Sequence, residues 1–369
     1  MNAPAPKVTL AAADYRPQVD LLCHHFLSGH VLYLAHAHGK GYFRDQGLFV
    51  NFSRTNHSPK VIDALERDIF KIGLATTTTF LRSIAKWVAD GNESKDYPLA
   101  MVYQADQSFS SAFYSLTNDY REQIGLPTYP KDVTTFEDLI GKIVRPGGGT
   151  PTEMFYLLAH QYGLLSRVNP SIEKNGFDPD KINLTEVEEY DVKTYSNLMI
   201  AGQLDVYSKP SFGHGQFLGR AKTTNSGLTH ASFSTLQAGL PTVYGVGVVV
   251  RKDFAIDHAD MLRAFLLAID KAMPECITDH MYAVRVMNEM RGFGREYDEI
   301  EGIKGAITAG KHPEITGGYG FYESDDTKQH GFGCIRDDKV QFLIDSLGKA
   351  GRLPASISLR DVCMDFAWH

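Results

Sequence analysis

The chain has 369 residues, of which 43% are hydrophobic and 22% are charged, and its net charge is −7. This balance excludes a largely disordered chain, and the length exceeds the ~250–300 residues at which one hydrophobic core stops growing, so two cores are expected. The negative charge and the absence of a long basic run argue against a nucleic-acid partner.

The sequence predicts neither membrane insertion nor a metal site. No run of 18 apolar residues occurs, and the first seven residues lack the basic and apolar regions of a secretory signal. We therefore expect a cytoplasmic protein, or a periplasmic one if an export signal was removed. The four cysteines lack metal-type spacing, and the histidines between residues 24 and 38 lack the i, i+4 spacing of a helical zinc site.

Strand-like and helix-like stretches alternate in the first part of the chain. The strand-like runs are Val8–Ala13, Val19–Cys23, Leu48–Phe52, Ile69–Leu74 and Leu99–Gln104. Helical patterns begin at Val31, at Ser58 and directly after Thr76–Thr79. Ser58 is expected to cap its helix, with Pro59 in the first turn.

The alternation continues in a second block. Its strand-like runs are Phe113–Leu116, Lys142–Arg145, Ile182–Val187 and Leu204–Tyr207, and its helical patterns are Thr135–Leu139, Thr150–Gly163 and Tyr190–Gly202. Thr150 and Glu153, three residues apart, predict a capping box in which each side chain bonds the backbone near the other.

A third block begins with Val243–Val250, whose lack of a polar face is typical of a buried central strand. Helical patterns follow at His258–Met273, Val340–Leu347 and Leu359–Phe366, and Ile315–Gly333 is interpreted as an ordered loop or lid. The alternation along the whole chain predicts an α/β protein with mostly parallel sheets.

Four local patterns resemble the type II periplasmic-binding-protein superfamily, in the branch of sulfonate- and taurine-binding and thiamine-pyrimidine-synthase-like proteins. They are LAHAHGKGYFRDQGL at 34–48, SPKVIDAL at 58–65 with IGLA at 72–75, LIGKIV at 139–144 before a Gly-rich turn, and VVVRKDF at 248–254 before a helix. The resemblance covers about residues 19–272.

The resemblance implies a two-lobed fold with a ligand cleft between the lobes. Residues 1–110 and 240–369 would form lobe one, and residues 111–239 would form lobe two. The chain would cross near Ser111–Ser115 and Thr235–Tyr244, which would act as hinges for closure.

The resemblance does not extend to the chemistry of the synthases. Ala75 and Thr79 stand where those proteins have a lysine and a histidine, and residues 229–234 read THASFS where they have a cysteine-rich motif. No pyridoxal phosphate and no other cofactor is therefore predicted.

Two polar segments are the main candidate binding site. The turn at 147–153 opens a helix, whose free N–H groups and dipole suit an anion, so Gly148, Gly149, Thr150 and Thr152 are candidate ligand contacts. The threonines from Thr76, with Thr77, follow a strand end and would face that turn if the lobes face each other.

Further polar residues follow other strand ends. Lys209 and His214 lie in the loop at 208–214 that follows the strand-like run at 204–207, and His25 follows the first family strand, so all three are candidate ligand contacts. His24 and His57 are the candidate catalytic residues if the protein is an enzyme, because either could donate a proton to a ring carbon.

Three functions stay open. The first is a substrate-binding protein that holds a small carboxylate- or sulfonate-bearing, aromatic or heterocyclic anion, with a transporter permease or a second copy of the chain as its partner. The second is a cytoplasmic lyase on the same fold, a decarboxylase or desulfinase of an aromatic acid. The opening residues LAAADY at 10–15 resemble the start of dihydroxyphthalate decarboxylases. The third is a cytoplasmic ligand sensor.

Overall fold

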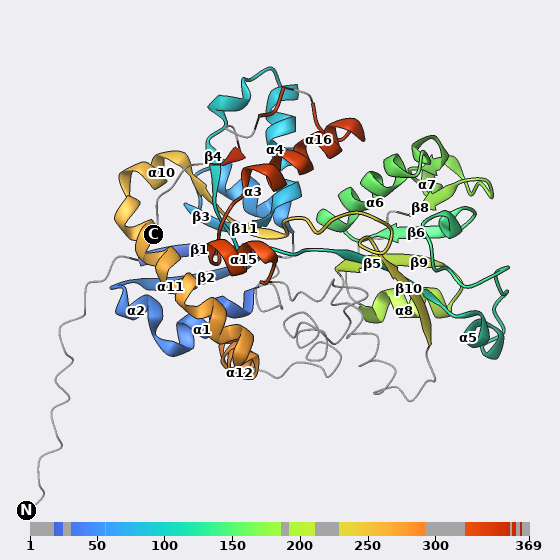
Figure 1. Ribbon diagram of the computed structural model, residues 1–369, viewed down its shortest axis with the longest axis horizontal. Helices are drawn as coiled ribbons and strands as arrows, with labels where there is room; N and C mark the ends of the chain where they lie inside the picture. Colours follow the sequence, from blue (N-terminus) through green and yellow to red (C-terminus); the bar gives the residue numbers. More distant parts are fainter. Residues whose placement is uncertain are drawn as a thin grey trace, which may run out of the picture.

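The computed structural model describes residues 18–24, 31–55, 57–185, 192–210, 229–291, 322–354, 356–358 and 362–363. Two mixed α/β units lie side by side, each with one sheet between layers of helices (Figure 1). We call the unit built on the first sheet the first lobe, and the unit built on the second sheet the second lobe.

The first sheet has five strands in the order β2-β1-β3-β11-β4. They are β1 (Gln18–His24), β2 (Phe49–Thr55), β3 (Ile72–Thr76), β4 (Leu99–Gln104) and β11 (Val246–Arg251). β1 runs parallel to β2 and β3, whereas β11 is antiparallel to both β3 and β4. β3 and β4 are buried along their whole lengths, and β11 up to its last residue, because helices cover both faces of the sheet.

Two groups of helices cover the first sheet on opposite faces (Figure 1). One group is α1 (Leu32–Lys40), α2 (Tyr42–Asp45), α11 (Ala259–Thr278) and α12 (His280–Arg291). The other includes α3 (Ser58–Glu66) and α4 (Thr77–Ala89), with the short η2 (Ser94–Asp96). α10 (Lys252–Asp257), α15 (Asp325–His330) and α16 (Asp337–Lys349) complete the described helices of the third block.

The second sheet has six strands in the order β10-β5-β9-β6-β8-β7. They are β5 (Ser111–Leu116), β6 (Ile143–Pro146), β7 (Val168–Asn169), β8 (Ile182–Leu184), β9 (Val206–Pro210) and β10 (His230–Ser234). The helices are α5 (Asn118–Gln123), η3 (Glu137–Leu139), α6 (Thr150–Gln161), η4 (Leu165–Arg167), α7 (Ile172–Asn175) and α8 (Val192–Ile200). α6 and α8 lie on opposite sides of this sheet (Figure 1).

Two segments outside the named helices and strands, 105–110 and 235–245, cross between the sheets and bond to each other. Phe109 and Val243 exchange both backbone hydrogen bonds, at 2.8 and 2.9 Å, and the Gly245 N–H donates to the Asp106 carbonyl at 3.0 Å. The Asp106 carboxylate is fully buried, and its Oδ2 accepts from the Val246 N–H at 3.0 Å. The paired crossings therefore form one connection.

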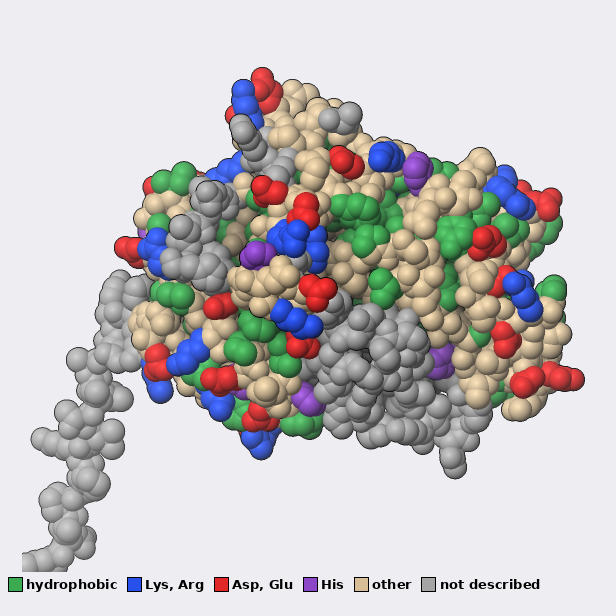
Figure 2. All heavy atoms as spheres, in the orientation of Figure 1, with side chains coloured by type: hydrophobic (Ala, Val, Ile, Leu, Met, Phe, Trp, Pro, Cys, Tyr) green, Lys and Arg blue, Asp and Glu red, His purple; other side chains and the backbone are tan. Residues whose placement is uncertain are grey.

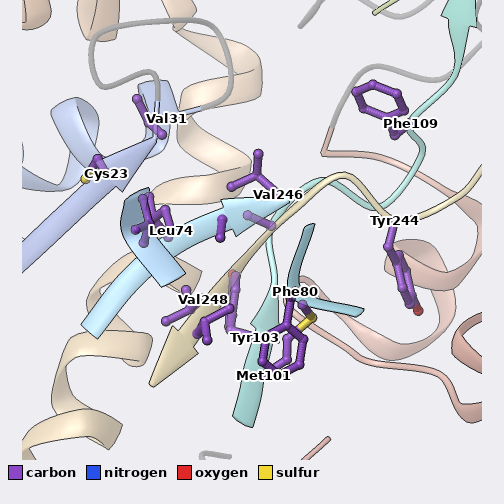
Figure 3. Close-up of a cluster of buried hydrophobic side chains, with 14 of the residues drawn as sticks. Cys23, Val31, Leu74, Phe80, Met101, Tyr103, Phe109, Tyr244, Val246 and Val248 are labelled. Atoms are coloured by element: carbon purple, nitrogen blue, oxygen red, sulfur yellow. The ribbon is translucent and has the colours of Figure 1, made fainter. Parts of the chain in front are cut away.

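A continuous hydrophobic core lies around the first sheet and extends into the second lobe. Figure 3 shows side chains from β3, β4 and β11 in this core, among them Leu74, Met101 and Val248. A smaller cluster on the other face of the second sheet includes Tyr114, Tyr195 and Tyr207. No helix among the described residues is both long and apolar enough to span a bilayer.

The two-lobed α/β fold expected from the sequence is confirmed, with finer differences. Both sheets are mostly parallel, as expected, but each contains one strand, β11 or β5, that runs antiparallel to its neighbours. β11 runs antiparallel because the chain returns directly from the second lobe without a crossover helix. β10 and α12 were not expected. The predicted run Val8–Ala13, most of Leu359–Phe366 and residues 315–321 of the predicted loop lie outside the described residues, and the described part of that loop contains the helix α15.

Two predicted helix caps are wrong. His57, not Ser58, is the N-cap residue of α3, and the Ser58 hydroxyl accepts from the Thr76 N–H at 3.1 Å. Gly149, not Thr150, is the N-cap residue of α6, and no side chain caps that helix. In both cases the hydroxyl bonds a residue far along the chain.

Candidate ligand-binding site

The starts of α4 and α6 meet where the two lobes touch. α4 begins after β3 in the first lobe, and α6 begins after β6 in the second lobe. The hydroxyls of Thr78 and Thr150 lie 2.9 Å apart, and both side chains are fully buried. The structure therefore brings the threonine run of 76–79 against the glycine-rich turn of 147–150.

Neither helix start has a side-chain cap. The first N–H groups of a helix have no acceptor within it, and the helix dipole places partial positive charge there. The Thr76 hydroxyl donates to the Thr79 hydroxyl at 2.8 Å and accepts from no first-turn N–H. The Thr77 N–H of α4 donates to the Gly245 carbonyl at 2.8 Å, so the other first-turn N–H groups of the two helices are the ones suited to an anion.

Gly149 brings the two backbones close together. Its φ of +69° and ψ of −129° are strained for any residue with a side chain. A Cβ at this position would lie 3.4 Å from Thr76 Oγ1 and 3.7 Å from Thr79 Oγ1. Gly149 and Thr79 are half-buried and Gly148 is exposed, so an edge of this junction stays accessible.

The hydroxyls of two predicted contact threonines, Thr77 and Thr152, donate to backbone carbonyls of the protein. The Thr152 hydroxyl donates to the Gly147 carbonyl at 2.6 Å and so fastens the turn. The Thr77 hydroxyl is fully buried and lies 2.9 Å from the Gly245 carbonyl and 3.0 Å from Gln104 Oε1. Thr77 therefore ties α4 to the crossing between the lobes.

Among the predicted histidines and the predicted lysine, the structure describes the side chains of His57 and Lys209. His57 precedes α3, is half-buried, and its N–H donates to Thr55 Oγ1 at 3.4 Å. Lys209 is half-buried in β9, one residue after Ser208, whose carbonyl accepts from the Gly147 N–H at 2.9 Å. His24 ends β1, and its side chain is outside the description.

His25 and His214 lie outside the described residues. Among the described residues, no group of three or more His, Cys, Asp or Glu side chains is arranged to hold a metal ion.

Two buried acids near the junction were not expected from the sequence. Asp106 joins the two crossings, as described above. Glu153 is 1% exposed and bonds two arginines. The polar run QADQS at 104–108, directly after a fully buried strand, was a signal that could have identified Asp106.

The sequence model of the NMT1/THI5-like family matches residues 29–280. The chain belongs to this family. No curated protein sequence matches it. Ala75 and Thr79 stand where the thiamine-pyrimidine synthases have a lysine and a histidine. These two residues do not fit pyridoxal phosphate, because Ala75 is fully buried in β3 and the Thr79 hydroxyl pairs with Thr76.

Solved structures with the same fold include periplasmic binding proteins. The aliphatic sulphonate-binding protein SsuA from Escherichia coli matches with a TM-score of 0.59 at 11% identity, over 95% of this chain and 92% of that chain. The nitrate-binding protein NrtA from Synechocystis matches with a TM-score of 0.58 at 13% identity, over 94% of this chain and 84% of that chain.

A third match is the CA3427 gene product of Candida albicans, with the generic periplasmic-binding-protein fold. It has a TM-score of 0.52 at 17% identity, over 89% of this chain and 95% of that chain. These identities support the fold alone. The expectations that the chain is a decarboxylase or is cytoplasmic gain no support from these neighbours, which include sulfonate- and nitrate-binding proteins.

Proposed function

We propose that this protein is the substrate-binding component of an uptake system and binds a small organic anion between its two lobes. The observation that carries the proposal is the pair of facing, uncapped helix starts, joined by the Thr78–Thr150 contact. Neutral backbone N–H groups and hydroxyls would hold a carboxylate or a sulfonate there. Thr79, Gly148 and Gly149 are the contacts we propose at its accessible edge.

The fold neighbours support a small-anion ligand, because two of them are an aliphatic sulphonate-binding protein and a nitrate-binding protein. The 18 tyrosines and 21 phenylalanines support a ligand with an aromatic or heterocyclic body. A permease is the partner that this function implies, and a periplasmic location follows from it. Lys, Arg, Asp and Glu side chains are interspersed on the face shown in Figure 2, without the large basic field that a polyanion would need.

Calorimetric titration with alkanesulfonates, aromatic sulfonates, aromatic carboxylates, nitrate and phosphate tests the proposal. We expect binding of one class, and we expect the variant Thr79→Val to weaken it because it removes a hydroxyl at the accessible edge. The matched control is Thr117→Val, which changes the N-cap of α5 in the second lobe. Binding that survives Thr79→Val unchanged would show that the anion binds elsewhere.

The bound compound should be recovered unchanged after long incubation. Its conversion to a product, followed by mass spectrometry, would replace the receptor function with an enzymatic one. Absence of binding by every anion in the series would remove the proposal altogether.

A further inference from the structure

Glu153 is a buried carboxylate where the two lobes meet. It is 1% exposed and lies on α6, one turn after Thr150. Its Oε1 accepts from Arg82 Nη1 at 3.1 Å and from Arg352 Nη2 at 3.0 Å, and its Oε2 accepts from Arg352 Nε at 2.9 Å. Both carboxylate oxygens are therefore engaged, and the pair with Arg352 is bidentate.

The three side chains come from three separate parts of the chain. Arg82 lies on α4 in the first lobe, Glu153 on α6 in the second lobe, and Arg352 just after α16. The Arg352 guanidinium also lies 4.2 Å from the ring centre of Tyr156, one turn further along α6. Figure 1 shows α16 beside α4 and reaching toward α6, and α16 and α6 are in contact.

The C-terminal segment that carries Arg352 is fastened to the first lobe on both sides. Before α16, the Gly333 carbonyl accepts from the Gln104 N–H of β4 at 3.0 Å. After it, the backbone of Cys363 forms an isolated parallel β-bridge with Met101 of the same strand. The bond from Arg352 to Glu153 is thus a second link between the lobes, independent of the link from Arg82.

The same helix faces carry the threonine contact and the ion pairs. Thr78 and Arg82 are four residues apart on α4, and Thr150 and Glu153 are three apart on α6, so each pair shares a face. A carboxylate this buried is tolerated only when it is paired. Separation of α4 and α6 would break the pair with Arg82 and expose the carboxylate, so the network favours the arrangement in which the helix starts meet.

We propose that Glu153 is a positioning residue, which clamps both α4 and the C-terminal segment against α6 and so sets the separation of the two lobes. The clamp acts in the protein without ligand. It therefore goes beyond the proposed anion binding and does not depend on which anion binds.

Small-angle X-ray scattering of the full chain without ligand tests the clamp. A compact chain of 369 residues has a radius of gyration of about 21 Å, against about 70 Å when unfolded. We expect Glu153→Gln to raise the radius measurably above the wild-type value while circular dichroism stays native. Arg82→Gln and Arg352→Gln, which each remove one link, should give smaller increases.

The control is Asp205→Asn. Asp205 is a largely buried acid of the second lobe that pairs with Arg121 at 3.8 Å and accepts from the Ile143 N–H at 2.8 Å, all within that lobe. This variant should lower the melting temperature without changing the scattering of the folded protein. A loss of stability alone therefore cannot imitate the expected result.

Folded Arg82→Gln and Arg352→Gln variants whose scattering matches the wild type would overturn the proposal. The same two variants decide the matter if Glu153→Gln does not fold, since Arg82 is 55% exposed and its replacement leaves the bidentate pair intact. Failure of the anion titrations would leave this result unaffected, because the scattering contains no ligand.

Discussion

Replacement of Gly149 with alanine should be costly, because a side chain disfavours the backbone conformation of this residue, with φ at +69° and ψ at −129°. A side chain in this region costs about 1–3 kcal/mol. The new Cβ would also lie 3.4 Å from Thr76 Oγ1, in van der Waals contact across the junction. Only this contact depends on how the lobes face each other.

The assay is thermal unfolding with matched controls. For 369 residues, 1 kcal/mol corresponds to about 1.3 °C in melting temperature, so the conformational penalty predicts a decrease of about 1–4 °C. Gly163→Ala is the control, because Gly163 follows the same helix at φ +67° and has nothing within 4 Å of an added Cβ. We expect Gly149→Ala to destabilise the protein more than Gly163→Ala.

A double-mutant cycle isolates the contact across the junction. Thr76→Ala removes the hydroxyl that the added Cβ would contact, so the losses of the two single variants should not simply add in the double variant Gly149→Ala/Thr76→Ala. Strict additivity, together with equal losses for Gly149→Ala and Gly163→Ala, would refute the reasoning that the two helix starts touch at this point.

Three further outcomes follow from buried groups. Thr77→Val should cost about 1–3 kcal/mol in urea unfolding, because it removes the hydroxyl that donates to the buried Gln104 Oε1, whereas the Gly245 carbonyl still accepts from the Thr77 N–H; no change would contradict the bond to Gln104. Burial lowers the pKa of His36 below its usual 6.5, so the folded state resists protonation and stability should fall as pH drops from about 7 towards the lowered pKa. His36→Asn should flatten that slope, and an unchanged slope would exclude His36 as its origin. Burial raises the pKa values of the Cys23 and Cys276 thiols, so both should react with a thiol reagent at pH 8 only after denaturation.

The strands of the first lobe were predictable because their apolar runs are strictly local signals. β4 has the bounds that the sequence predicted, Leu99–Gln104, and every residue of it is buried. β10 was not predicted, since its sequence HASFS has no strand pattern of its own. It is a strand because it pairs with β5, which lies more than 100 residues earlier, and that pairing has no local signal.

The candidate site was predictable in position but not in detail. Strand ends followed by threonine or glycine indicated both helix starts. The partners of individual hydroxyls could not be predicted, because Thr78 and Thr150 are 72 residues apart in sequence. Thr77 and Thr152 were expected to face a ligand, but their hydroxyls bond the backbone within the protein, and a sequence pattern does not show which way a side chain turns.

The wrong capping box at Thr150 and Glu153 has a physical consequence for the site. In a capping box the glutamate bonds backbone at the start of its own helix, and the threonine hydroxyl accepts from a first-turn N–H. Here the Glu153 carboxylate bonds two arginines and the Thr150 hydroxyl bonds Thr78, so neither occupies the first-turn N–H groups of α6. The contacts that join the lobes are thus the same ones that leave the start of α6 without a side-chain cap. A local rule fails at this position because both side chains take tertiary partners, and such failures are expected at functional sites.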